Sequence, residues 1–190
     1  MDLNYYEQEK NVKGYADFKP THDGALLVDT LVEHLPAGSS VLEIGIGPGK
    51  DFKALSKHFD VTGSDFSRLF LKMYREKDSE ADLLHLDART LETDRNFDAI
   101  FSNKALIHLD DDELRQSFAR QHAVLNDGGL ILHSFWNGEG SWKSDGLTLV
   151  YRNEKELTDM LAGQFDIIAI KPHAKMADND SVCVLARKTG

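Results

Sequence analysis

Short apolar runs alternate with amphipathic stretches through most of this chain of 190 residues. The runs 41–44, 61–64 and 97–101 have the length of β-strands, and segments with a helical spacing of apolar residues lie between them. Strands that alternate with helices predict βαβ units, in which helices cover both faces of a parallel sheet. The pattern therefore predicts an α/β fold.

The C-terminal part of the chain departs from this alternation. Ranges 165–170 and 181–186 both have strand-like sequences, and residues 171–180 between them show no helical pattern. We therefore expect these two strands to pair antiparallel. The expected strands are 41–44, 61–64, 83–86, 97–101, 129–135, 165–170 and 181–186, and the expected helices are 22–35, 50–58, a segment capped by Ser67, 110–125 and 153–161.

Composition limits the partners and the compartment. The chain has 22 basic and 32 acidic side chains, and the net charge of −10 argues against a nucleic-acid-binding surface. Its single cysteine excludes an intramolecular disulfide and a multi-cysteine metal site. No apolar run reaches the roughly 18 residues of a membrane helix, and the N-terminus lacks the features of a signal peptide. We expect one cytoplasmic domain over residues 1–190, without metal, nucleic acid or membrane.

A glycine-rich turn follows the first predicted strand. The sequence VLEIGIGPGKD at 41–51 runs from a strand through G-x-G-x-G into a helix. Glycines let the backbone turn tightly and let a ligand approach closely. A dinucleotide site has the spacing G-x-G-x-x-G, whereas here the third glycine comes one residue early and Lys50 takes the dinucleotide position. Glu43 at the strand end would repel a pyrophosphate but suits a cationic ligand.

Two further acids stand at the ends of neighbouring predicted strands. Asp65 follows the second strand, where a carboxylate can accept both hydroxyls of a ribose, and Asp87 follows the third strand. Ligands of open α/β sheets bind at the carboxyl ends of the strands, so Glu43, Asp65 and Asp87 should meet in one crevice. Such a crevice suits a nucleoside that carries positive charge and no phosphate. The alternatives are a ligand-free turn, a helix-capping role for Asp65 and a solvated loop acid at Asp87.

These features resemble the class I S-adenosylmethionine-dependent methyltransferases that act on small molecules. The motifs that carry the resemblance are E-x-G-x-G-x-G at 43–49, G-S-D-F-S at 63–67, L-D-A at 86–88, F-D-A-I-F-S-N at 97–103 and V-L-N-D-G-G-L-I-L at 124–132. Each motif is weak alone, but their order and spacing together are specific. The resemblance covers about residues 20–188 and implies a Rossmann-like seven-stranded mixed sheet of order 3-2-1-4-5-7-6, with the last strand antiparallel and helices on both faces.

The resemblance also implies which residues bind the cofactor, S-adenosylmethionine. Gly45, Gly47 and Gly49 would line its methionine part, and Glu43 would meet its ammonium group directly or through water.

At the nucleoside end, the resemblance places Asp65 against the ribose hydroxyls and Phe66 against the adenine. Asp87 would accept a hydrogen bond from the adenine amino group, with Ala88 beside it.

The residues after the fourth strand would face the sulfonium end of the cofactor. The resemblance assigns Asn103 and Lys104 to this place, although a cation beside a sulfonium is unfavourable, so Lys104 should point to solvent or toward an anionic substrate. His108 is the candidate catalytic base, and the alternative is that it only shapes the pocket.

Aromatic residues outside these motifs are candidates for the acceptor pocket. They are Tyr6, Trp136, Trp142 and Tyr151, and the alternative for the last three is packing on the C-terminal hairpin. Residues 1–20 form a candidate N-terminal lid, as N-terminal segments do in relatives; the alternative is a disordered or partner-bound end.

The leading hypothesis is methyl transfer to a small-molecule acceptor with release of S-adenosylhomocysteine, by a monomer or homodimer. A non-catalytic S-adenosylmethionine-binding or regulatory protein of the same fold is the alternative. A nucleotide-dependent oxidoreductase is a third hypothesis, against which the early third glycine and Glu43 both argue.

Overall fold

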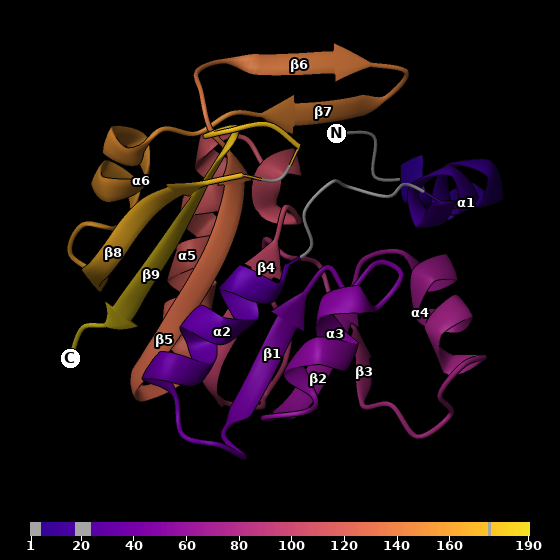
Figure 1. The fold of residues 1–190 in the computed structure, drawn as a ribbon, viewed down its shortest axis with the longest axis horizontal. Coiled ribbons are helices and arrows are strands. Elements are labelled where there is room, and N and C mark those ends of the chain that lie inside the picture. Colours follow the sequence, from indigo (N-terminus) through magenta and orange to yellow (C-terminus); the bar gives the residue numbers. More distant parts are fainter. Residues whose placement is uncertain (1–4, 18–23, 175) are drawn as a thin grey trace.

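A seven-stranded sheet of order β3-β2-β1-β4-β5-β9-β8 forms the centre of the protein (Figure 1). The computed structural model describes residues 5–17, 24–174 and 176–190. The strands are β1 (Ser40–Ile44), β2 (Asp60–Asp65), β3 (Leu83–His85), β4 (Phe97–Asn103), β5 (Leu125–Trp136), β8 (Phe165–His173) and β9 (Ser181–Lys188). The first five run parallel, and β9 is antiparallel to both β5 and β8. The predicted strand order and the antiparallel C-terminal pair are confirmed.

Helices lie on both faces of the sheet. They are α1 (Glu9–Asp17), α2 (Ala25–His34), α3 (Lys50–Leu55), α4 (Arg68–Arg75), α5 (Asp111–Val124) and α6 (Glu154–Leu161), with short 3-10 helices η1 (Tyr5–Glu7) and η2 (Leu106–His108). Apolar residues of α2, α3 and α4 form one buried cluster, and those of α5 and α6 form another. In the described part of the chain, no helix has the length and apolar character needed to cross a membrane.

Strand β4 shows why this sequence forms a central strand. Ala99 and Phe101 belong to the cluster that contains α2 and α3, whereas Ile100 between them belongs to the cluster that contains α5 and α6. Successive side chains of a strand point to opposite faces, so a strand covered on both sides is apolar at successive positions. The sequence accordingly reads Ala-Ile-Phe at 99–101, after Phe97 and the half-buried Asp98.

Capping side chains fix where helices α4 and α5 begin. The Ser67 hydroxyl accepts a hydrogen bond from the Phe70 amide at the start of α4, as the sequence predicts. Helix α5 begins with a capping box, in which Asp110 and Glu113 each accept from the other's backbone amide. Such caps satisfy amides that have no partner within the helix.

A second, two-stranded sheet is absent from the sequence-based prediction. Strands β6 (Ser141–Ser144) and β7 (Leu147–Val150) form a hairpin where the sequence indicates a glycine-containing loop (Figure 1). Asp145 and Gly146 both have positive φ, as a two-residue hairpin turn requires. The Asp-Gly pair was therefore the overlooked sequence signal.

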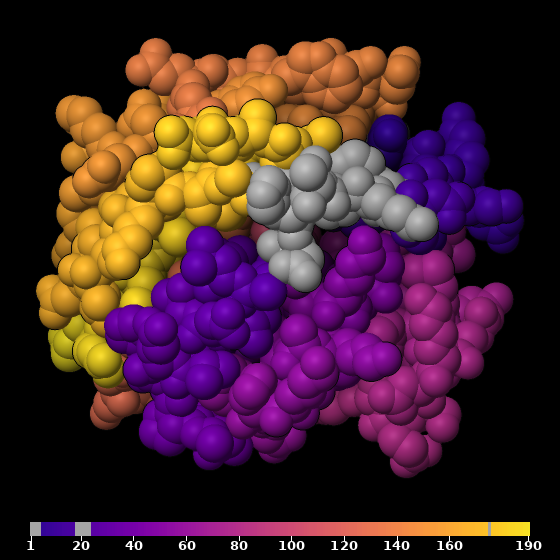
Figure 2. All heavy atoms as spheres, viewed as in Figure 1, coloured from indigo at the N-terminus to yellow at the C-terminus, as the bar shows by residue number. Residues whose placement is uncertain are grey.

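The N-terminal segment is helical within its described residues. Helix α1 packs beside α4, and Figure 2 shows it at one side of the molecule. Residues 1–4 and 18–20 of the candidate lid lie outside the described part of the chain.

Replacing Phe118 by alanine should destabilise the fold strongly. Phe118 is fully buried on α5, with its ring beside those of His133 and Phe165. We expect the Phe118→Ala variant to lose about 3–5 kcal/mol of unfolding free energy, because a cavity replaces packed ring atoms. Denaturant unfolding followed by circular dichroism measures this. Leu26→Ala, at an exposed position of α2, is the control and should change stability by less than about 0.5 kcal/mol; equal effects of the two variants contradict the assignment of the core.

Candidate functional site

A cavity of about 950 Å³, including its open mouth, lies at the carboxyl ends of β1 to β4. Its walls come from the loops that follow these strands and from Tyr6 and Tyr15 of the N-terminal segment. The predicted site residues that line it are Tyr6, Gly45, Gly47, Asp65, Phe66, Asp87, Ala88, Asn103, Lys104 and His108. Residues from five separate parts of the sequence therefore meet in one place.

The glycine turn after β1 is held against the end of β2. Gly45, Gly47 and Gly49 all have positive φ, a conformation that disfavours other residues. A Cβ added at Gly45 would lie 2.4 Å from the Cβ of Ala105, so the turn has no room for a side chain there. The amides of Gly45 and the following residue both donate to the Ser64 carbonyl, at 2.7 and 3.0 Å. Gly49, which precedes α3, does not line the cavity, and a Cβ added to it would clash with the Tyr74 ring of α4.

Asp65 connects two of the loops that form the cavity. Its Oδ2 accepts from the Gly47 amide at 3.0 Å, and its Oδ1 accepts from the Ser67 amide at 2.8 Å. Burial raises the pKa of Asp65 to about 6, although these two hydrogen bonds act in the opposite direction. Each carboxylate oxygen has two acceptor positions, so both oxygens can accept one further donor.

Glu43 places a buried carboxyl group behind the glycine turn. The side chain is 2 % exposed, does not line the cavity and has, among the described residues, no hydrogen-bond partner for Oε2. Burial raises the pKa of Glu43 well above its usual value, and the negative charges of Asp51 and Asp65 raise it further. A buried acid surrounded by like charges is costly unless a cation compensates it.

Asp51 belongs to the same acidic group but is not among the residues predicted from sequence. Its Oδ2 accepts from Asn103 Nδ2 at 2.9 Å, and the buried Oδ1 of Asn103 has no partner within the described chain. The available signal was its place in the first turn of the helix that follows the glycine turn.

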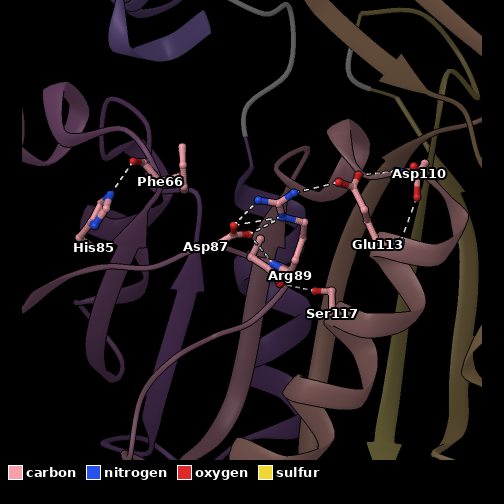
Figure 3. Close-up of polar contacts among 8 residues, drawn as sticks. Phe66, His85, Asp87, Arg89, Asp110, Glu113 and Ser117 are labelled. Carbon is pink, nitrogen blue, oxygen red and sulfur yellow. Dashed lines mark hydrogen bonds and ion pairs between the residues drawn. The ribbon is translucent and has the colours of Figure 1, made fainter. Parts of the chain in front are cut away.

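Asp87 is paired with a cation that the sequence analysis also missed. Its two oxygens accept from Arg89 Nε at 2.9 and 3.0 Å, and Oδ2 accepts from Nη2 at 2.5 Å (Figure 3). Burial acts to raise the pKa of Asp87, but the hydrogen bonds from Arg89 outweigh it and hold the pKa below its usual value. Nearby, the His85 ring donates from Nε2 to the Phe66 carbonyl at 2.8 Å (Figure 3).

An aromatic cluster covers one side of the cavity. The Tyr6 ring lies 5.7 Å from the rings of Tyr15 and Phe70 and 5.8 Å from His108, measured between centroids. The Ser67 hydroxyl donates to the Tyr6 carbonyl at 2.6 Å and thereby fixes the N-terminal segment to the start of α4.

His108 has a defined tautomer because of its contact with the hairpin. Its Nδ1 lies 2.7 Å from the Thr148 carbonyl of β7, which can only accept, so Nδ1 carries the proton. Burial lowers the pKa of His108, so the ring is neutral near pH 7. Nε2 is then left with a lone pair on a residue that lines the cavity.

Lys104 points neither to solvent nor into open space. Its ammonium group is buried, donates to the Phe135 carbonyl and lies 4.3 Å from the centroid of the Trp136 ring. The Trp136 ring therefore packs against Lys104. Trp136 is also not among the residues that line the cavity. Trp142 is 47 % exposed on β6, and Tyr151 packs beside Gly138; neither lines the cavity.

Metal ligation has no candidate group in residues 5–17, 24–174 and 176–190. No three His, Cys, Asp or Glu side chains there come together in a way that could hold an ion.

Comparison with known proteins finds one family model and several solved structures that are similar to this chain. A family model described as "Methyltransferase domain" matches residues 41–129. None of the curated proteins matches the chain in sequence. An S-adenosylmethionine-dependent methyltransferase from Clostridium acetobutylicum is similar in structure, with a TM-score of 0.75, 16% identity and coverage of 93% of this chain and 94% of that one.

Two further similar structures contain S-adenosylhomocysteine. One is the 1,6-didemethyltoxoflavin-N1-methyltransferase of Burkholderia thailandensis, also crystallised with 1,6-didemethyltoxoflavin (TM-score 0.77, 20% identity, coverage of 98% and 84%). The other is the N-methyltransferase NodS of Bradyrhizobium japonicum (TM-score 0.75, 17% identity, coverage of 100% of both chains). At these identities the likeness shows a shared fold.

The Nε2 atom of His108 should remain unprotonated as the pH falls toward 6.5, the ordinary pKa of a histidine. Burial opposes the second proton, so we expect half-protonation at a pH clearly below 6.5. A pH titration of the ¹⁵N resonances of the imidazole measures both the tautomer and the pKa, and the His108→Gln variant assigns the signals. A proton on Nε2 of the neutral ring, or half-protonation at or above 6.5, contradicts the prediction.

Proposed function

We propose that this chain, whose residues 41–129 match the methyltransferase-domain model, belongs to that family and transfers a methyl group to a small-molecule acceptor. S-Adenosylmethionine is the cofactor of this family, and the methyl group that it supplies is bound to a positively charged sulfur. The chain's contribution is to bind this molecule, to align the acceptor with the methyl group and to exclude water.

The buried carboxyl group of Glu43 carries the proposal. Its Oε2 has no partner among the described residues, and Asp51 and Asp65 add negative charge around it. A group of three acids around the glycine turn is stabilised by a cation, and the ammonium group of the cofactor supplies one. The close approach of Gly45 and Ala105 further supports the fit, since the turn leaves backbone rather than side chain toward a ligand.

The remaining contacts follow from the residues that line the cavity. Asp65 has free acceptor positions for the hydroxyls of a ribose. Asp87 accepts from the adenine amino group, with Phe66 and Ala88 beside the base. Asn103, next to Asp51, lies on the side of the amino acid part.

The methyl end of the site is bounded by the residues after β4. Lys104 keeps its ammonium group on the Phe135 carbonyl and the Trp136 ring, and therefore away from a sulfonium. His108 offers the lone pair of Nε2 to a proton on the acceptor's nucleophile, which makes it the general base of this proposal. We further propose that residues 5–17 act as a lid of a single domain, because Tyr6 and Tyr15 cover the cavity.

The enclosure of the cavity supports a small acceptor. The cofactor would fill part of the space at the carboxyl ends of β1 to β4, so only the remainder is left for an acceptor. The aromatic cluster around Tyr6 narrows the space that remains. The Burkholderia protein named above acts on a small heterocycle, which supports the same class of acceptor by analogy alone.

Replacing Asp65 by alanine should weaken cofactor binding. We expect isothermal titration calorimetry to show S-adenosylhomocysteine binding to the unmodified chain and about 10-fold or greater loss of affinity in Asp65→Ala, because hydroxyl donors lose a charged acceptor. Asp60→Ala is the matched control, since Asp60 is exposed at the opposite end of the same strand. The cofactor assignment is wrong if the unmodified chain does not bind, or if both variants bind equally.

Labelled methyl groups should pass from S-adenosylmethionine to a small molecule. We would supply a panel of phenols, amines, thiols and carboxylic acids in parallel with total protein, RNA and DNA. We expect the unmodified chain to transfer label to compounds of the panel. The His108→Gln variant should transfer much less label while its affinity for S-adenosylhomocysteine is unchanged. Label only on macromolecules contradicts the small acceptor, and binding without any transfer favours the non-catalytic alternative.

A further inference from the structure

The hairpin of β6 and β7 is attached to the rest of the protein at its base. The two strands form a small sheet of their own. At the open end of the hairpin the Arg152 amide donates to the Trp136 carbonyl at 2.9 Å, and the Gly138 amide donates to the Arg152 carbonyl at 3.3 Å. A two-stranded hairpin is only marginally stable by itself, so its position depends on such attachments.

The Arg152 side chain joins this base to the segment that follows His108. It is buried, its Nη2 donates to the Leu109 carbonyl at 3.2 Å, and its Nη1 pairs with Asp111 Oδ1 at 2.6 Å. Leu109 directly follows η2, and Asp111 is the first residue of α5. The planar fork of an arginine can serve two such acceptors at once. The guanidinium therefore fixes the hairpin to the junction of η2 and α5.

This contact contributes geometry more than stability. The side chain of Asp111 is 67 % exposed, whereas that of Arg152 is 4 % exposed. A guanidinium that leaves water to meet an exposed carboxylate gains little net free energy from the charge pair. The position of the hairpin is what the pair determines.

The same hairpin holds the ring of His108. Nδ1 of His108 donates to the Thr148 carbonyl of β7 at 2.7 Å. This contact and that of Arg152 fall on two successive residues, His108 and Leu109. Between Thr148 and Arg152, Leu149 packs against the core cluster that contains Leu109. The contact at Thr148 therefore depends on the attachment beside it.

The Thr148 carbonyl decides how the His108 ring can exchange a proton. The proton of a neutral imidazole stays on the nitrogen that has an acceptor, so Nε2 has the lone pair. If the hairpin moves away, Nδ1 loses its acceptor and the proton can return to Nε2. A neutral ring with its proton on Nε2 would donate into the cavity and could not take a proton there.

We propose that Arg152 is a positioning residue for His108. By fastening the β6–β7 hairpin to the junction of η2 and α5, it keeps the Thr148 carbonyl on Nδ1 and the lone pair on Nε2. Arg152 does not line the cavity, so it acts through another residue. This role rests on the proposed function, because the tautomer matters for methyl transfer only where Nε2 faces the acceptor.

The ¹⁵N resonances of the imidazoles in the ligand-free chain test this role, because protonated and unprotonated ring nitrogens differ widely in chemical shift. Spectra would be recorded at about pH 8, where an ordinary histidine is neutral. The His108→Gln variant assigns the signals of His108 among the eight histidines. Arg152→Met removes the guanidinium and keeps the length of the side chain, whereas Arg152→Lys keeps the charge without the fork.

Arg95→Met is the matched control. Arg95 also pairs with one carboxylate, that of Asp82, and with one neutral oxygen, Thr62 Oγ1. Asp82 precedes β3, and none of these three residues lines the cavity.

We expect the unmodified chain and Arg95→Met to hold the proton of His108 on Nδ1 rather than Nε2 in a ratio of about 10:1 or more. The ratio should fall below about 3:1 in Arg152→Met and lie between these values in Arg152→Lys. A lower melting temperature of Arg152→Met with an unchanged ratio shows a purely structural role and overturns the inference. A proton on Nε2 in the unmodified chain overturns it as well.

Variants of α5 decide the question should Arg152→Met fail to fold by circular dichroism. Asp111→Asn weakens the partner of Arg152, and Asp112→Asn changes the neighbouring exposed acid of the same turn. We expect the ratio to fall in Asp111→Asn and to stay unchanged in Asp112→Asn; equal ratios in the two variants overturn the inference. Because the tautomer is read without ligand, such a failure leaves methyl transfer in place. Absence of label transfer instead removes the proposed function and leaves the tautomer ratios standing.

Discussion

The hydrogen bonds of the Asp65 carboxylate hold the site together. One oxygen accepts from the Gly47 amide of the glycine turn and the other from the Ser67 amide at the start of α4. Ser67 in turn donates to the Tyr6 carbonyl, so the same chain of contacts reaches the N-terminal segment over the cavity. Three parts of the chain that are far apart in sequence thus depend on one carboxylate at the end of β2, and parallel strands are what bring them there.

The two ends of the cavity differ in how their acids are compensated. Burial raises the pKa of Glu43 and Asp65, and the negative charges of Asp51 and Asp65 raise the pKa of Glu43 further. Asp87 has the opposite environment, since the hydrogen bonds from Arg89 hold its pKa down. The acids around the glycine turn therefore favour a cation, whereas Arg89 already compensates the charge of Asp87. A nucleoside with its positive charge at the far end from the base matches this distribution.

The sequence predicts the parts of this structure that depend on local spacing. Apolar periodicity gives the sheet, the glycine spacing gives the turn, and strand ends give the place of Asp65 and Asp87. It does not give contacts that only the fold creates. Arg89 could not be assigned to Asp87 or Glu113 from spacing alone, because a side chain two residues away is equally free to turn to solvent. Lys104 was expected toward solvent or substrate, yet it is buried on the Phe135 carbonyl, 31 residues away in sequence.

The residues that we propose to face the acceptor come from other elements than those that surround Asp65 and Asp87. His108 stands on η2 and takes its tautomer from Thr148 of the β6–β7 hairpin, which is a separate sheet. Tyr6 comes from the N-terminal segment. None of these elements is a strand of the seven-stranded sheet, so we expect them to vary without disturbing the strand ends. Similarity at 16–20% identity shows the shared fold and not the acceptor, so we expect the residues that determine the acceptor to lie in the hairpin, η2 and the N-terminal segment.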